Sequence, residues 1–446
     1  MMTNRRWYVL ALLGLAFLMT TLDSTILIAA LPSITSGLGL RPATAQWVLI
    51  AYAIPFSGLL LLCGRAADLF GRRRMFLTGV ALRISAAVLC GLAGSGGALI
   101  AGRLLQGLSA GIIAPAALSM VTTAFPEGPE RNKALGIWGG LGGVGATAGL
   151  LLGGFITDAY GWQMVFFLNV PVCVLVLAVA PALLTESRGA PVRSFDLAGA
   201  AAITAALALL ILAVVSVPMA GWLSVRTLGG LAGAAVLAGV FVLVEARSAA
   251  PLVPPRIRRS RSLVGGNLLI VTAGMCVDGM LVTLTSYVQR VLGWSAGQFG
   301  LLAAVMTVTS VAGLMIAQRL ITRLGVRPVA IAGGLCLAVA ALLLSPGSPG
   351  LLAAGLVVFG AGMGGAFVAA QIAAFTGVAE EDSGLAAGLV DTSFSMGCAL
   401  GVAICTSVAL AGDAAGYRAA FAVVALFALA GLPATGPRAV AVLDAE

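Results

Sequence analysis

Long apolar segments separated by short polar breaks dominate the hydrophobic pattern of this chain. A membrane-spanning helix needs about 20 mostly apolar residues, and segments of that length recur from one end of the sequence to the other. Strands of a membrane barrel are only about ten residues long and alternate apolar with polar positions, whereas these segments are continuous and rich in Leu, Ala and Gly. The pattern therefore predicts an all-α membrane protein.

We predict fourteen spans, separated by polar residues. They cover residues 7–31, 46–64, 75–94, 97–124, 136–158, 163–184, 196–217, 225–245, 263–288, 296–318, 328–345, 349–375, 385–411 and 417–434. The first span follows two arginines and could be mistaken for a signal peptide. It is too long for that and contains Asp23, so we expect it to stay in the membrane.

Composition agrees with a chain that is solvated mainly by lipid. Hydrophobic residues make up 60% of the 446 positions and charged residues only 9%, against roughly 25% charged in soluble domains. The mean hydropathy is +1.10. The seven cysteines fall in or beside apolar segments without the spacing of a metal site or a disulfide framework, so we expect them to be small core residues.

The basic residues indicate how the chain is oriented. The formal net charge is +9, but Lys and Arg are spread over short loops rather than gathered in one domain, so we expect no nucleic-acid partner. If the N-terminus is cytoplasmic, most of the 25 basic residues fall on the cytoplasmic side, in line with the positive-inside rule. The loop after the twelfth span is the exception, with Glu380, Glu381 and Asp382 and no basic residue. We expect both termini in the cytoplasm and the protein in the inner or plasma membrane.

A ten-residue pattern occurs twice in the chain. Residues 64–73 (GRAADLFGRR) align with residues 318–327 (QRLITRLGVR), with two arginines and one glycine at the same offsets. Each copy follows the second span of a six-span block, which is typical of transporters built from two parallel bundles. We predict an N-terminal six-helix bundle in residues 1–186, an inserted pair of transmembrane helices in 187–250 and a C-terminal six-helix bundle in 251–446.

The first copy of this pattern closely resembles the loop signature of the major facilitator superfamily. Gly, Asp and Arg have the spacing of that signature and its place after the second span. The glycines allow tight turns, and Asp68 can face a helix N-terminus. The resemblance implies the fold of that family and a cytoplasmic latch, whose residues here are Gly64, Arg65, Asp68, Gly71, Arg72 and Arg73. An ordinary basic loop is the alternative, and the second copy has Thr322 in place of Asp68.

The fourth span carries a charge inside the membrane. Residues 103–107 (RLLQG) resemble the family's intramembrane arginine motif. An arginine at this depth costs about 2.5–3.5 kcal/mol or more unless it is compensated. Asp23 in the first span lies at a similar depth, so we predict that Asp23 and Arg103 pair. The pair either holds two helices together or responds to a proton on Asp23 that loosens Arg103 and shifts the bundle.

Glycines form a stripe along the fifth span. Gly145, Gly149 and Gly153 are four residues apart, with Gly154 beside them, so a neighbouring helix can pack closely against this side. The segment also resembles the antiporter motif of drug-exporting members of the family, although Leu150 replaces its usual proline. Close helix packing and a role in antiport are the two alternative interpretations of this glycine stripe.

Two further strings resemble the fourteen-span drug:proton antiporter branch of that family. They are residues 22–32 (LDSTILIAALP) and 162–171 (WQMVFFLNVP), and with the span count the likeness covers nearly the whole chain. Ile28 stands where the branch commonly has Asn, and residues 391–397 (DTSFSMG) also depart from its pattern. The choice of substrate is therefore expected to be unusual.

Carboxylates are the candidates for proton coupling, because the chain contains no histidine. Those inside predicted spans are Asp23, Asp278 and Asp391. Asp278 can take a proton, meet a cationic substrate or pair with a polar neighbour such as Asn267 or Gln289. Gln106 and Gln371 are candidate contacts in a central cavity, with an interhelical hydrogen bond as the alternative.

These features predict a proton-coupled secondary transporter that exports small hydrophobic or cationic compounds, as in drug or antibiotic efflux, by alternating access. A solute importer on the same fold and a non-transporting membrane sensor are the alternatives. We expect no enzyme activity, because no nucleophile with a base, histidine-based metal site or phosphate-binding loop is recognisable. We expect no cofactor or metal, the proton gradient being the energy source. The expected partners are the lipid bilayer, protons and a small-molecule substrate, and the protein is expected to act as a monomer.

Overall fold

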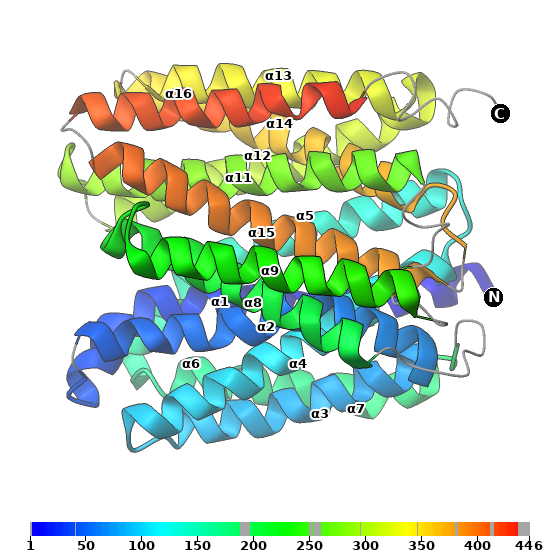
Figure 1. Cartoon of the computed structure of the whole chain (residues 1–446). Coiled ribbons are helices and arrows are strands. Elements are labelled where there is room, and N and C mark those ends of the chain that lie inside the picture. Colours follow the sequence, from blue (N-terminus) through cyan, green and yellow to red (C-terminus); the bar gives the residue numbers. More distant parts are fainter. Residues whose placement is uncertain are drawn as a thin grey trace. The chain divides into compact units, whose positions relative to one another are not determined.

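The computed structural model describes residues 2–40, 42–187, 197–248, 253, 260–294, 296–345, 347–379, 382–410 and 414–435. Within these ranges all regular structure is helical and no strand is present. Figure 1 shows long helices joined by short connections. The all-α architecture predicted from the apolar segments is therefore confirmed.

The chain forms two compact units, and each includes a short segment from the part of the sequence that mostly forms the other. The first contains residues 1–125, 141–195 and 379–391, and the second contains residues 126–140, 196–378 and 392–446. Two helices are therefore divided: α5 (Pro129–Tyr160) begins in the second unit and ends in the first, and α15 (Ser383–Leu410) begins in the first and ends in the second.

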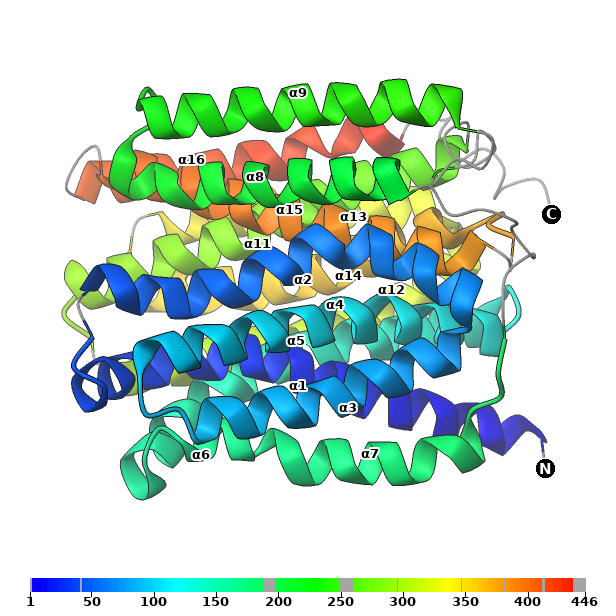
Figure 2. The same ribbon diagram turned by 60° about the horizontal axis from the view of Figure 1, so that its bottom comes forward.

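The first unit is built from helices of the N-terminal part of the chain. They are α1 (Met2–Gly37), α2 (Pro42–Phe70), α3 (Arg72–Gly91), α4 (Gly96–Ala124), the short α6 (Met164–Phe167), α7 (Asn169–Leu183) and the parts of α5 and α15 just named. Helices α3 and α7 lie side by side, as Figures 1 and 2 both show. Ile26, Val48, Leu99 and Phe166 are among the side chains that form its buried core.

The second unit contains the helices that follow residue 196. They are α8 (Leu197–Ala220), α9 (Val225–Arg247), α11 (Arg261–Arg290), α12 (Ala296–Leu324), α13 (Val326–Leu344), α14 (Pro349–Phe375), α16 (Ala414–Ala430) and the 3₁₀ helix η2 (Leu432–Thr435), with the parts of α5 and α15 named above. Met280, Leu284, Phe359 and Phe421 belong to its core. Val214 and Val217 of α8 pack with Ala403 of α15, so the two inserted helices belong to this unit. The division at residues 186 and 250 stays a prediction.

Local sequence explains where several helices begin. Ser95, Ser224 and Ser260 precede α4, α9 and α11, and each hydroxyl accepts a hydrogen bond from the backbone N–H three residues later. The two copies of the repeated pattern form the same turn. Gly71 separates α2 from α3 with φ 107°, and Gly325 separates α12 from α13 with φ 84°, a region that favours glycine.

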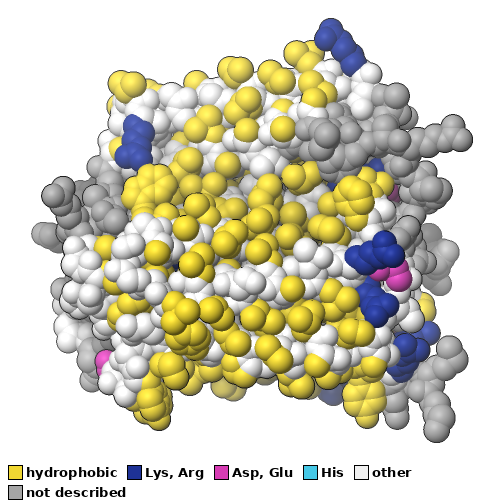
Figure 3. Space-filling model, turned by 90° about the horizontal axis from the view of Figure 1, so that it is seen from below, with side chains coloured by type: hydrophobic (Ala, Val, Ile, Leu, Met, Phe, Trp, Pro, Cys, Tyr) yellow, Lys and Arg dark blue, Asp and Glu magenta, His cyan; other side chains and the backbone are white. Residues whose placement is uncertain are grey.

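The described residues contain twelve helices that are long and apolar enough to cross a membrane, and two shorter apolar helices, Ala201–Val214 and Ala415–Ala430. The shorter pair coincides with two of the predicted spans, and the count of fourteen stays a prediction. Large hydrophobic side chains are exposed, such as Leu223 and Val225. Hydrophobic side chains are spread over the middle of the face in Figure 3, with Lys and Arg toward its margins. Apolar exposure this extensive is unusual in water and is expected against lipid.

Candidate functional site

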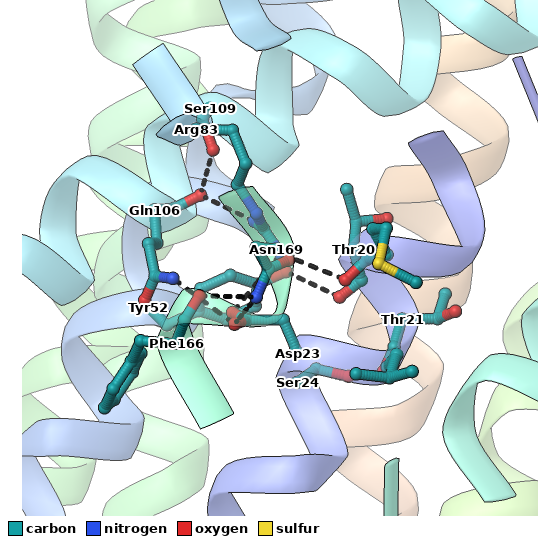
Figure 4. Close-up of polar contacts among 12 residues, drawn as sticks. Thr20, Thr21, Asp23, Ser24, Tyr52, Arg83, Gln106, Ser109, Phe166 and Asn169 are labelled. Carbon is teal, nitrogen blue, oxygen red and sulfur yellow. Dashed lines mark hydrogen bonds and ion pairs between the residues drawn. The ribbon is translucent and has the colours of Figure 1, made fainter. Parts of the chain in front are cut away.

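Asp23 of α1 is the centre of a fully buried polar cluster in the first unit (Figure 4). Its Oδ2 atom lies 2.8 Å from Arg103 Nη1 on α4 and 3.3 Å from Arg83 Nη2 on α3. Its Oδ1 atom accepts hydrogen bonds from Gln106 Nε2 at 3.3 Å and from Asn169 Nδ2 at 3.1 Å. The predicted pairing of Asp23 with Arg103 is present, and the cluster ties four helices together.

The buried guanidinium group of Arg103 has several partners. Besides Asp23, its Nη1 donates to Gln106 Oε1 at 2.9 Å and its Nε to the Val48 carbonyl at 3.2 Å. The guanidinium carbon lies 4.5 Å from the centroid of the Tyr52 ring, a cation–π geometry. Gln106 therefore forms the interhelical hydrogen bonds that were one of its two predicted roles. Its part in binding substrate stays a prediction.

Arg83 and Asn169 were not predicted as site residues. Arg83 is completely buried and also donates to the Met19 carbonyl at 3.1 Å and the Gln106 carbonyl at 3.4 Å. An arginine inside an apolar segment was a visible signal. The sequence does not tell which side of α3 faces α1, so the link to Asp23 could not be derived.

Asp68, in the loop signature, contacts the N-terminus of α15. Its carboxylate accepts hydrogen bonds from the backbone N–H groups of Gly384 at 3.0 Å and Leu385 at 2.9 Å. Arg72 pairs with the same carboxylate, with Nη2 2.9 Å from Oδ1. A helix N-terminus carries positive partial charge, so this carboxylate stabilises the start of α15. The residue was expected to face a helix N-terminus, and the structure identifies that helix.

The other latch residues surround this contact. A Cβ added to Gly64 would collide with the Gly384 carbonyl, so α2 and α15 approach too closely for any larger residue. Arg65 Nη1 lies 3.9 Å from Asp382 Oδ1. Arg73 contacts a different segment, since its backbone N–H donates to Glu186 Oε1 at 3.2 Å. Glu380 and Glu381, which precede this contact in the chain, lie outside the described residues.

The glycine stripe of α5 packs against α1, the helix that carries Asp23. A Cβ on Gly145 would lie 2.9 Å from the Leu18 carbonyl, and one on Gly149 would lie 2.5 Å from the Leu22 carbonyl. Gly153 is buried, whereas a Cβ on Gly154 would meet nothing within 4 Å. Close packing is thus present at the first two positions. The side chains of Leu150 and Ile28 lie outside those described.

Asp278 of α11 lies in the second unit, where its carboxyl group interacts with the Cys398 thiol of α15. Glycine makes this contact possible, because a Cβ on Gly274 would lie 3.0 Å from Cys398 N. Asn267 does not pair with Asp278 but accepts from Ser393 Oγ at 2.8 Å. The pairing of Asp278 with Asn267, one of the interactions considered for Asp278, is therefore not present.

Asp391 and Gln371 are half-buried and buried, respectively. Asp391 Oδ2 and Gln371 Oε1 have no hydrogen-bond partner among the described residues. Neither is bonded to the Asp23 cluster within that part of the chain. No group of three or more Cys, Asp or Glu side chains is placed to hold a metal ion in the described ranges. The geometry thus joins Asp23, Arg103 and Gln106, and leaves Asp278, Asp391 and Gln371 apart from them.

Comparison with known proteins decides the family. The sequence profile of the Major Facilitator Superfamily matches residues 13–244 and 267–441. The chain belongs to this superfamily. It is therefore a transporter of small molecules and not an enzyme, and a multi-pass membrane protein.

Several relatives within the superfamily align over most of the chain. The cephamycin export protein CmcT of Amycolatopsis lactamdurans is 38% identical over 93% of this chain and 89% of its own length. The multidrug resistance protein Stp of Mycobacterium tuberculosis is 34% identical over 89% of this chain and 74% of its own. The puromycin resistance protein of Streptomyces alboniger is 34% identical over 92% and 83%.

A solved structure shows the superfamily fold directly. The human organic anion transporter MFSD10 matches 97% of this chain and 99% of its own with a TM-score of 0.73, at 18% sequence identity. At this identity the likeness extends to the fold alone. The major facilitator fold predicted from the loop signature and the repeated pattern is thus confirmed.

Proposed function

We propose that this protein exports small hydrophobic or cationic compounds, drugs or antibiotics among them, across the plasma membrane in exchange for protons. The observation that carries the proposal is the 38% identity over 93% of the chain to a protein named for cephamycin export. Relatives named for multidrug and puromycin resistance, at 34% identity, support the same direction of transport. A sensor that has lost transport would have to share this likeness without the activity.

Proton coupling is the part of the proposal that the embedded carboxylates support. The whole chain lacks histidine, while Asp23, Asp278 and Asp391 lie within membrane helices. Carboxylates in such helices are expensive and usually functional. Each proton entering down a potential of 100 mV supplies about 2.3 kcal/mol, which is enough to concentrate a neutral compound about fiftyfold.

The division of α5 and α15 between the two units supports alternating access. The first residues of α15 belong to the first unit and the rest to the second, and α5 is divided in the opposite order. We propose that the contact of Asp68 with the N-terminus of α15 is a latch that is made and broken during the cycle. Both termini are proposed to be cytoplasmic, and a monomer without a bound cofactor is proposed to be sufficient.

Everted membrane vesicles containing the protein test the direction and the coupling together. Acidifying the vesicle interior should make them accumulate a cationic dye, and an uncoupler should release it. Vesicles with the Asp68→Asn, Asp278→Asn double variant at equal expression serve as the control. Dye leaving the vesicles on acidification would favour the importer, and absence of any movement would favour the sensor.

A further inference from the structure

The Asp23 cluster contains more positive than negative charge. Two guanidinium groups, those of Arg83 and Arg103, pair with one carboxylate, so the three groups sum to +1 when Asp23 is ionised. All three side chains are at most 1% exposed. In the described residues, Asp23 is the acidic group within ion-pair distance of either arginine, and Arg83 Nε is buried there without a hydrogen-bond partner.

The other groups around Asp23 do not offset this charge. The titratable ones are Tyr52 of α2, Cys90 of α3 and Cys173 of α7, all of which are neutral at pH 7. The remaining contacts are the amides of Gln106 and Asn169, which donate to Oδ1 and so also favour the ionised form (Figure 4).

A proton on Asp23 would therefore leave two buried cations beside a neutral group. Removing one member of a buried ion pair is strongly unfavourable because the partner charge is left uncompensated, and here two partners would be left. Asp278 and Asp391 are in a different position, since neither forms an ion pair within the described ranges and a proton on either leaves no cation stranded.

We propose that Arg83 is a positioning residue that, together with Arg103, keeps Asp23 ionised throughout the transport cycle. Asp23 is then a fixed structural charge, and the transported proton is carried by one of the embedded carboxylates without an ion pair in the described residues, Asp278 or Asp391. The inference rests on the proposed proton-driven export. It selects the static role for the Asp23–Arg103 pair from the two that the sequence left open.

Charge-balanced variants test this. Asp23→Asn leaves a charge of +2 in the cluster and should lower both the yield of folded protein and its melting temperature. Asp23→Asn combined with Arg83→Met returns the charge to +1. The double variant should recover folding and accumulate dye in acidified everted vesicles to within about threefold of wild type. Asp278→Asn combined with Asp391→Asn should abolish this accumulation while dye still equilibrates down its own gradient.

The opposite pattern would overturn the proposal. If the folded Asp23→Asn, Arg83→Met double variant equilibrates dye but cannot accumulate it against a gradient, Asp23 carries the proton. If the double variant does not fold, the single variant Arg83→Met tests whether Asp23 carries the proton. The pH midpoint of its export should equal that of wild type, because the coupling group lies elsewhere. An upward shift of about 1–3 pH units, the usual effect of removing a cation next to a carboxyl, would identify Asp23 as the carrier.

Proton-driven export and the charge link between Arg83 and Asp23 can be tested separately. If the wild-type protein shows no proton-driven transport in vesicles where a known exporter does, the proposed function is wrong. The melting temperatures of the single and double variants still test whether Arg83 and Asp23 are linked by charge. Equal destabilisation by Asp23→Asn with and without Arg83→Met would refute that link.

Discussion

Single residues show how this chain tolerates charge inside the membrane. Arg83 and Arg103 are each completely or almost completely buried. Apart from the Gln106 side chain, which lies on α4 with Arg103, the hydrogen-bond and ion-pair partners described above for the two arginines come from other helices or are backbone carbonyls. Hydrogen bonds to charged groups contribute more than neutral ones, roughly 1.5–3 kcal/mol each. The cluster therefore fixes the relative rotation of α1, α3 and α4 in addition to any part in transport.

Gln106 provides a residue-scale prediction about this cluster. Gln106→Leu removes the bonds to Asp23 and Arg103 and should destabilise the folded protein by about 1–3 kcal/mol. Gln371→Leu is the matched control, because Gln371 Oε1 is buried without a partner among the described residues. Thermal unfolding in detergent should give a clearly lower midpoint for Gln106→Leu than for Gln371→Leu. Equal midpoints would contradict the assigned role.

The arrangement of helices depends on where small residues allow backbones to meet. Gly149 packs against the backbone of α1 at Leu22, the residue before Asp23. Gly64, one turn before Asp68 on α2, packs against the backbone of α15 at Gly384. Helix association in lipid is driven by such close packing rather than by the hydrophobic effect. Gly64 thus allows Asp68 to reach the N-terminus of α15, and Gly149 allows α5 to pack against α1, the helix that carries Asp23.

Gly149→Ala should be poorly tolerated. The new Cβ would lie 2.5 Å from the Leu22 carbonyl, so α1 and α5 must separate, at an expected cost of about 1–3 kcal/mol. Gly154→Ala adds a methyl group where nothing lies within 4 Å and should be neutral or slightly stabilising. Expression and export measured side by side test this. The account fails if the two variants behave alike.

The repeated pattern supplies a control for the latch. Asp68→Asn removes the buried ion pair between this carboxylate and Arg72 and weakens the cap of α15, so export should fall at least tenfold, or about 1.4 kcal/mol. Thr322 occupies the same place in the second copy, and its hydroxyl donates to the Gln318 carbonyl of its own helix. Thr322→Ala should export normally. A normal export rate for Asp68→Asn would exclude the latch.

For the whole molecule, the sequence indicated how deep a residue lies in the membrane. It said much less about which side of a helix faces a given neighbour and about which unit each segment joins. The length of the apolar segments predicted the spans. The similar depth of Asp23 and Arg103 in their spans predicted that the two residues pair. Arg83 and Asn169 could not be assigned to that pair, because periodicity does not say which helix a face meets. The division of α5 and α15 between units was also not predicted, since it depends on contacts between distant parts of the chain.

Membrane orientation is a prediction at the same scale. Cysteines introduced next to Arg72 and Arg258 should both react with a membrane-impermeant reagent only from the cytoplasmic side, because the positive-inside rule places both basic segments there. A background without the seven native cysteines is needed for this labelling. Reaction of the two positions from opposite sides would rule out the proposed two-bundle topology.

The account as a whole stands on coupling between an embedded carboxylate and uphill export. Purified protein in liposomes, given an acid-inside pH gradient, tests this most directly when wild type is compared with the Asp278→Asn, Asp391→Asn double variant. The account predicts that wild type concentrates a cationic dye and that the variant only equilibrates it. It would be contradicted by a variant that concentrates the dye as well as wild type does, or by a wild-type protein that moves no dye at all.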